Sequence, residues 1–124
     1  MAMEQSLHSI CRWTFNAGKG GFVPADARPD WLGKGMDTVK MIELVRRKIA
    51  PRVPDNVVLG VEMHYDNEVC EKTAAAVADA LVSNKIHLAM TTPGAHVHFA
   101  YGGIASMDPH ERKEADEFGA TAVE

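Results

Sequence analysis

A carboxylate, a histidine and a second carboxylate alternate along one short segment of the chain. Glu62, His64 and Asp66 occupy every second position, and because side chains alternate between the two faces of a strand, all three are expected on one face. A carboxylate beside an imidazole fixes its tautomer and stabilises the imidazolium. The spacing predicts a general base at His64, although a polar cluster that only satisfies its own hydrogen bonds at a strand end has the same spacing.

Two further groups have weaker chemical signatures. His96 and His98 would share a face of an extended segment, as Zn²⁺ or Fe²⁺ ligands do, but no third ligand is near, and such pairs are more often polar surface or core residues. The glycine-rich stretch 18–21 offers backbone N–H groups to an anion, yet it lacks the spacing of a phosphate-binding loop. We therefore predict no metal site in this chain, and a plain turn at 18–21.

The composition is that of an ordinary globular domain. Hydrophobic residues make up 46% and charged residues 24% of the 124 residues, a length that allows one core. The net charge is -4, with basic residues spread along the chain. This pattern gives no electrostatic footprint for nucleic acid or for an anionic membrane, so we expect neither partner.

Cysteine usage and the start of the chain favour a cytoplasmic protein. Cys11 and Cys70 lie in apolar stretches, and two free, buried thiols are typical of a reducing compartment. The first residues contain no apolar signal-peptide core with a small-residue cleavage site. No run approaches the roughly 20 apolar residues of a membrane-spanning helix.

Hydrophobic periodicity predicts an alternation of strands and helices. The expected strands are short and apolar or β-rich, and they cover 7–15, 57–65 and 86–91. Three helices are expected. The first is capped by Asp37 and stopped by Pro51, and the second spans 73–82 with Asn84 as a left-handed terminator. The third begins at the capping box Asp108–Glu111. The segment 22–35, rich in Pro, Gly and Asp, is expected to be a long loop.

The order β-α-β-α-β-α predicts an α/β fold with parallel strands and helices outside them. A complete three-stranded sandwich is one alternative. However, the final ATAVE has neither a terminating turn nor a polar tail, and a three-stranded parallel sheet leaves two edges uncovered. We therefore expect residues 1–124 to form a single partial domain of a larger barrel or sheet.

Several segments, in this order, resemble the first three β-α units of the xylose isomerase family. They are RWTF (12–15), MDTV (36–39), GVEMHYDNEV (60–69) and, most specifically, MTTPGAHVHFAYGGIASMDPHER (90–112). The resemblance covers nearly the whole chain from about residue 10 onward. It implies the N-terminal portion of a (β/α)₈ TIM barrel, with its site at the carboxyl ends of the strands.

The resemblance also implies a reaction and the residues that take part in it. The family interconverts an aldose and a ketose, such as xylose and xylulose, by ring opening and a hydride shift assisted by two divalent cations, Mg²⁺ or Mn²⁺. His64 matches the histidine that assists ring opening, and Trp13 the tryptophan lining the sugar pocket. Thr91 matches a pocket threonine behind that histidine, and Phe22 a phenylalanine lent to the site of a neighbouring subunit.

The chain departs from the family in its carboxylates. The family's orienting carboxylate lies three places after the histidine, where this chain has Asn67. We expect Asp66 to replace it because it shares the side of His64; the alternative is a branch of the family with an altered sugar or rate. The metal ligands of the family belong to later strands. The chain alone is therefore expected to bind no catalytic metal and to be inactive as an isomerase, and to associate with copies of itself or with a complementary fragment.

Two other functions fit the same residues. One is a related sugar-phosphate isomerase or epimerase, in which the stretch 18–21 would bind phosphate. The other is a non-catalytic, truncated barrel fragment that acts only as a structural or association module.

Overall fold

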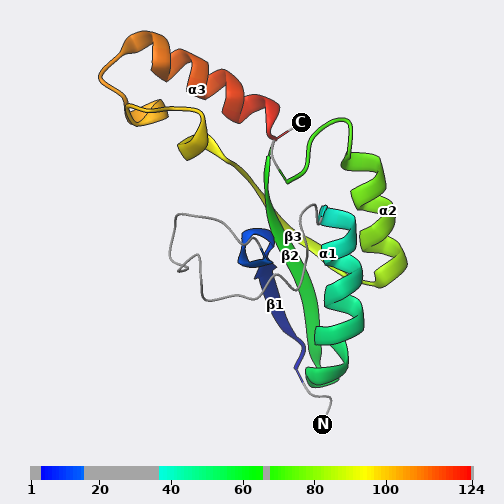
Figure 1. Cartoon of the computed structure of the whole chain (residues 1–124). Helices are drawn as coiled ribbons and strands as arrows, with labels where there is room; N and C mark the ends of the chain where they lie inside the picture. Colours follow the sequence, from blue (N-terminus) through cyan, green and yellow to red (C-terminus); the bar gives the residue numbers. More distant parts are fainter. Residues whose placement is uncertain (1–3, 16–36, 66–67, 124) are drawn as a thin grey trace.

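The structure is a computed structural model that describes residues 4–15, 37–65 and 68–123. Three parallel strands form one sheet in the order β1 (Ser6–Cys11), β2 (Val57–Tyr65), β3 (His87–Pro93). Helix α1 (Thr38–Leu44) precedes β2, α2 (Ala74–Asn84) connects β2 to β3, and α3 (Pro109–Thr121) follows β3 (Figure 1). The predicted α/β class with parallel strands is confirmed, whereas its place in a (β/α)₈ barrel stays a prediction.

The core lies between the sheet and the pair α1 and α2. Because side chains alternate along a strand, Leu59, Val61 and Met63 of β2 turn toward the helices, and all three are buried. They pack with Met41 and Ile42 of α1, which are fully buried. Burying one such side chain is worth about 1.5–3 kcal/mol, so this layer makes a substantial contribution to the stability of the described fold.

Helix α1 begins at its predicted cap. Asp37 Oδ1 accepts a hydrogen bond from the backbone N–H of Lys40 at 2.8 Å. The helical path then continues through a π-helical turn, Val45–Ile49, and a 3₁₀ turn, Ala50–Arg52. The run ends close to Pro51, as predicted: the π-helical turn ends at Ile49, and Pro51 lies in the short 3₁₀ turn that closes the run, near the start of the turn where its missing N–H is not needed.

Helix α2 ends at Asn84, two residues past the predicted span 73–82, and its left-handed terminator comes one residue later than predicted. The left-handed residue is Lys85, with φ 55, and not Asn84. Asn84 stays helical and its side-chain amide donates to the carbonyl of Ala80 at 2.8 Å. The last turn closes through the backbone bond from Ile86 N–H to the carbonyl of Leu81, the pairing expected of a left-handed helix end.

Helix α3 projects away from the sheet (Figure 1). Asp108 is its N-cap and accepts from the backbone N–H of His110 at 2.9 Å. Glu111, predicted to close the capping box, instead accepts from the backbone N–H groups of Tyr101 and Gly103 at 3.1 and 2.8 Å. Gly103 has φ +59, a conformation that favours glycine, so Glu111 fixes the loop before α3.

The first strand is shorter than predicted. β1 ends at Cys11, and residues 12–15 form a 3₁₀ turn, Arg12–Phe15. The turn includes Arg12, whose side chain is buried. The third strand is longer than predicted and reaches Pro93.

The pairing of β2 with β3 shifts by one residue halfway along. Gly60 and Val61 pair with His87 and Leu88, but Glu62 pairs with Met90, so Ala89 is the extra residue of a β-bulge. A Cβ at Gly60 would lie 3.1 Å from the Cβ of Ala89. A side chain at position 60 would therefore crowd the two strands at the bulge, and glycine avoids this contact.

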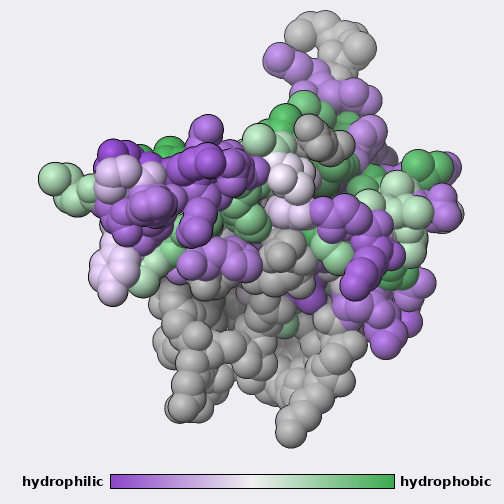
Figure 2. All heavy atoms as spheres, turned by 90° about the horizontal axis from the view of Figure 1, so that it is seen from above, coloured by the Kyte–Doolittle hydropathy of each residue, from purple (hydrophilic) through white to green (hydrophobic). Residues whose placement is uncertain are grey.

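The surface seen from above, at the carboxyl ends of the strands, is mixed in character. Hydrophilic residues dominate the outer parts of the described surface, and hydrophobic residues gather between them (Figure 2). Within the described residues, no helix combines the length and the apolar character that crossing a membrane requires.

The left-handed residue after α2 predicts a stabilising substitution. The left-handed conformation costs a residue with a side chain about 1–2 kcal/mol, a cost that glycine does not have. Glycine loses more conformational freedom on folding, which offsets about 0.5–1 kcal/mol of that gain. We expect Lys85→Gly to raise the free energy of unfolding by roughly 0.5–1 kcal/mol, measured by urea denaturation. The control is Ala78→Gly in α2, expected to lower it by about 1 kcal/mol; a lower stability of Lys85→Gly would contradict the assigned conformation.

Candidate functional site

His64 lies at the carboxyl end of the central strand, one residue before β2 ends. Its side chain is partly buried, with 18% of its surface exposed. The imidazole stacks on the indole of Trp13, with ring centroids 4.3 Å apart and an angle of 16° between the planes. The structure thus brings together two predicted site residues that are far apart in the sequence.

A second histidine borders the same ring. His96 lies in the 3₁₀ turn Ala95–Val97 after β3, and its imidazole meets that of His64 edge-on at 5.4 Å. His98 packs instead on Phe118 of α3, with ring centroids 4.7 Å apart. The two histidines do not share a face as predicted, because the segment is a helical turn and not an extended strand.

Among the residues that the structure describes, Glu68 places a carboxylate beside His64. Its Oε2 accepts from the backbone N–H of His64 at 2.8 Å and lies 3.6 Å from Nδ1 of the ring. The second separation is too long for a hydrogen bond but short enough for charge attraction when the ring is protonated. Asp66, which was predicted to orient His64 in place of Asn67, lies outside the described residues, as does Asn67.

Sequence reasoning missed Glu68 because it extended strand alternation past the strand end. The chain turns back after Tyr65, where the backbone N–H groups of Glu68 and Val69 both donate to the carbonyl of His64 at 3.0 and 3.2 Å. This turn brings Glu68, four residues after His64, back next to the histidine. The usable signal was a second acidic residue, Glu68, within one turn of the strand end.

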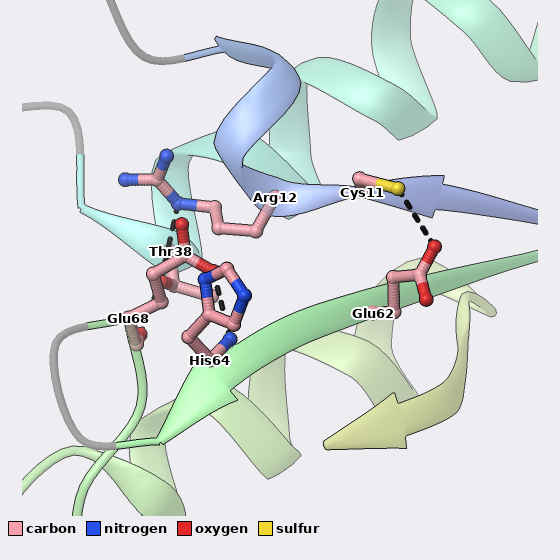
Figure 3. Close-up of polar contacts among 6 residues, drawn as sticks. All are labelled: Cys11, Arg12, Thr38, Glu62, His64 and Glu68. Carbon is pink, nitrogen blue, oxygen red and sulfur yellow. Dashed lines mark hydrogen bonds and ion pairs between the residues drawn. The ribbon is translucent and has the colours of Figure 1, made fainter. Parts of the chain in front are cut away.

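Glu62 shares the face of His64, but its partner is a thiol. Cys11 Sγ–H donates to Glu62 Oε1 at 2.7 Å, from the residue that pairs with Glu62 in the sheet (Figure 3). Burial, followed by the hydrogen bond and the negative charge of Glu62, raises the pKa of Cys11 from 9.0 to about 11. Cys11 is therefore a protonated donor at neutral pH.

A buried arginine connects the elements around His64. Arg12 is 6% exposed and its Nε donates to Thr38 Oγ1 at 3.3 Å; that hydroxyl in turn donates to the backbone carbonyl of Glu68 (Figure 3). Burial lowers the pKa of the guanidinium below its ordinary value, while the charges of Glu68 and Asp37 act to raise it. Nothing in the sequence pattern distinguished Arg12 from a surface arginine.

The remaining predicted residues fall in different places. Thr91 pairs with Met63, whose side chain is in the core, whereas Thr92 pairs with His64. The hydroxyl oxygen of Thr92 is buried and has no hydrogen-bond partner among the described residues. Phe22 and the glycine-rich stretch 18–21 lie outside the part of the chain that the structure describes.

The site can hold and orient one imidazole at the edge of a sheet. Trp13 covers one face of the ring, Glu68 lies near Nδ1, and His96 meets the ring edge-on. Such an arrangement suits proton exchange with a bound hydroxyl group. Within residues 4–15, 37–65 and 68–123, no three His, Cys, Asp or Glu side chains are grouped closely enough to hold a metal ion.

Comparisons with protein-family models, with curated proteins and with solved structures gave no match.

The two cysteines are expected to differ in reactivity. The pKa of Cys11 is raised to about 11, whereas that of Cys70 is lowered, chiefly by its hydrogen bond with Thr73. Because the thiolate is the nucleophile, we expect iodoacetamide at pH 8 to modify Cys70 at least about 100-fold faster than Cys11, measured by peptide mass spectrometry over time.

Replacing the partner of Cys11 tests the cause. Glu62→Gln removes the negative charge and should speed the modification of Cys11, while the exposed control Glu43→Gln should leave the rate unchanged. Equal rates at Cys11 and Cys70 in the unmodified chain would show that the thiol of Cys11 is not held protonated.

Proposed function

We propose that this chain carries the ring-opening part of a sugar aldose-ketose isomerase of the xylose isomerase type. The sequence resemblance gives the reaction class, and the site gives a chemical role for His64. The observation that carries the proposal is the imidazole of His64, stacked on Trp13 and next to the carboxylate of Glu68, at the carboxyl end of the central parallel strand. That end of a parallel sheet is where ligands bind in α/β folds.

Ring opening of a cyclic aldose is a proton transfer problem. A proton leaves the anomeric hydroxyl, the bond between the anomeric carbon and the ring oxygen breaks, and the ring oxygen takes up a proton. A single imidazole can perform both transfers in turn, because it accepts and donates protons near neutral pH. Trp13 provides an apolar surface beside the ring, and a carboxylate oxygen of Glu68 lies 3.6 Å from Nδ1 of the imidazole.

The isomerisation step needs more than these residues. In the proposed reaction the hydride shift between adjacent carbons is assisted by Mg²⁺ or Mn²⁺, which polarises the sugar oxygens. The described residues include no set that fits such an ion. We therefore assign no residue of this chain to the hydride shift and expect its ligands on other strands.

The proposal predicts a partial reaction. The chain is expected to accelerate the interconversion of the α- and β-anomers of xylose, because that reaction needs ring opening alone. His64→Asn should reduce the added rate by at least about 100-fold, the scale of a lost general base. The measurement is the decay of optical rotation of freshly dissolved α-xylose.

Two controls accompany this measurement. His110→Asn changes an exposed histidine at the start of α3 and should keep the full rate. Formation of xylulose should be absent even with added Mg²⁺ or Mn²⁺, which separates ring opening from isomerisation. If the unmodified chain and His64→Asn give the same anomer interconversion rate, the proposed role of His64 is wrong.

A second candidate function is an association module, and the two outer strands favour it. Both flanks of the described sheet end in strands, β1 and β3, that pair only with β2 among the described residues. Large apolar side chains on them are exposed, with Leu7 at 80% and Leu88 at 53%. Open strand edges with exposed apolar residues pair readily with further strands, and we propose copies of the same chain as the partner.

Association is expected to depend on the outer strands. Sedimentation velocity at micromolar concentration should show species larger than a monomer, and Leu88→Lys in β3 should shift them toward the monomer by placing a charge at the edge. Val82→Lys, at an apolar position on α2 that is also exposed, is the control. A strictly monomeric chain would remove this candidate.

The sugar-phosphate alternative depends on the stretch 18–21, which is not among the described residues. It stays an alternative that a comparison of phosphorylated and free sugars in the anomer assay would separate from the first proposal.

A further inference from the structure

We infer that Arg12 is the positioning residue of the His64 site, holding Trp13 against the face of the imidazole and Glu68 beside its Nδ1. The inference rests on the proposed function only in taking His64 as the reacting group. It assigns no contact between Arg12 and a substrate.

The guanidinium of Arg12 lies in an unusual place for a charge. It belongs to a four-residue 3₁₀ turn just after β1, a segment of a kind that normally exposes its charged side chains, yet it is 6% exposed. Burying a charge is costly unless other groups compensate it. Thr38 Oγ1 accepts its Nε–H at 3.3 Å, and the negative charges of Glu68 and Asp37 act on it.

The first route of positioning runs through the turn that carries both Arg12 and Trp13. The hydrogen bond from Arg12 to Thr38 ties this turn to the first residue of α1, and Thr38 is itself 5% exposed. Because Trp13 is the next residue along, fixing Arg12 limits where the indole can lie. The stacked geometry of Trp13 on His64, at 4.3 Å, follows from this anchoring.

The second route runs through Glu68. The hydroxyl of Thr38 donates to the backbone carbonyl of Glu68, so the anchored turn also holds the segment that returns to His64. The side chain of Glu68 is 5% exposed, and a buried carboxylate needs positive charge nearby. Arg12 provides that charge, which keeps Oε2 of Glu68 in place near His64 Nδ1.

The two routes can be measured without any sugar. In a Trp31→Phe background, Trp13 is the only tryptophan of the chain, so quenching of its fluorescence by acrylamide reports whether it is covered. The ¹⁵N shifts of the histidine ring, at one fixed pH, report which ring nitrogen of His64 carries the proton; a carboxylate close to Nδ1 favours the proton there.

Arg12→Met is expected to increase acrylamide quenching of Trp13 several-fold and to reduce the Nδ1–H fraction of His64. Arg12→Lys keeps the charge but lacks the Nε–H, so it should expose Trp13 while retaining more of the Nδ1–H form than Arg12→Met does. Arg47→Met, at an exposed arginine, should change neither signal. If circular dichroism shows that Arg12→Met does not fold, the same two signals are compared between Arg12→Lys and Arg47→Lys, and only Arg12→Lys should change them.

Unchanged signals in a folded Arg12 variant overturn the inference and leave Arg12 a stabilising residue only. Anomer interconversion separates this failure from that of the proposed function. If the unmodified chain does not accelerate the reaction but the Arg12 variants shift both signals, positioning stands and the sugar assignment falls. If the chain accelerates the reaction and the Arg12 variants shift neither signal, the sugar assignment stands and the positioning role of Arg12 falls.

Discussion

The pairing of β2 between two parallel neighbours is the constraint on which the described fold depends. A central strand must satisfy both of its edges with backbone hydrogen bonds, and only its two faces remain for side chains. One face, with Val61 and Met63, is committed to the helices α1 and α2. The other face, with Glu62 and His64, is thereby kept for polar groups, and the strand end brings His64 to the rim of the sheet.

Polar groups on that second face are held by one long-range partner and one local partner. Glu62 accepts from Cys11 of the neighbouring strand, and Glu68 reaches His64 because the chain turns back after the strand. Arg12 donates to Thr38, and Thr38 donates to the backbone of Glu68, so these hydrogen bonds join three segments that are distant in the sequence. The geometry around the imidazole therefore depends on the tertiary fold rather than on any one segment.

The sequence was sufficient to predict the elements whose cause is local. Asp37 and Asp108 cap helices because their side chains reach N–H groups within the same turn, and the alternation along β2 follows from its apolar run. It was insufficient where a distant group decides the outcome. The turn at Arg12 depends on its contact with Thr38, 26 residues away, which no local window of sequence contains. Glu68, four residues after His64, is brought to it by the turn that follows β2, and strand alternation alone does not predict that turn.

The bulge at Ala89 decides which threonine lies opposite His64 in the sheet. Had the pairing that begins with Gly60 and His87 continued in step, Thr91 would lie opposite His64; the extra residue puts Thr92 there instead. One extra residue in β3 therefore determines which side chain is paired with His64, without any change in the residues of the site. Related chains that lost or gained this single position would present a different neighbour to the same histidine, and matching them residue for residue without a gap would assign the wrong threonine.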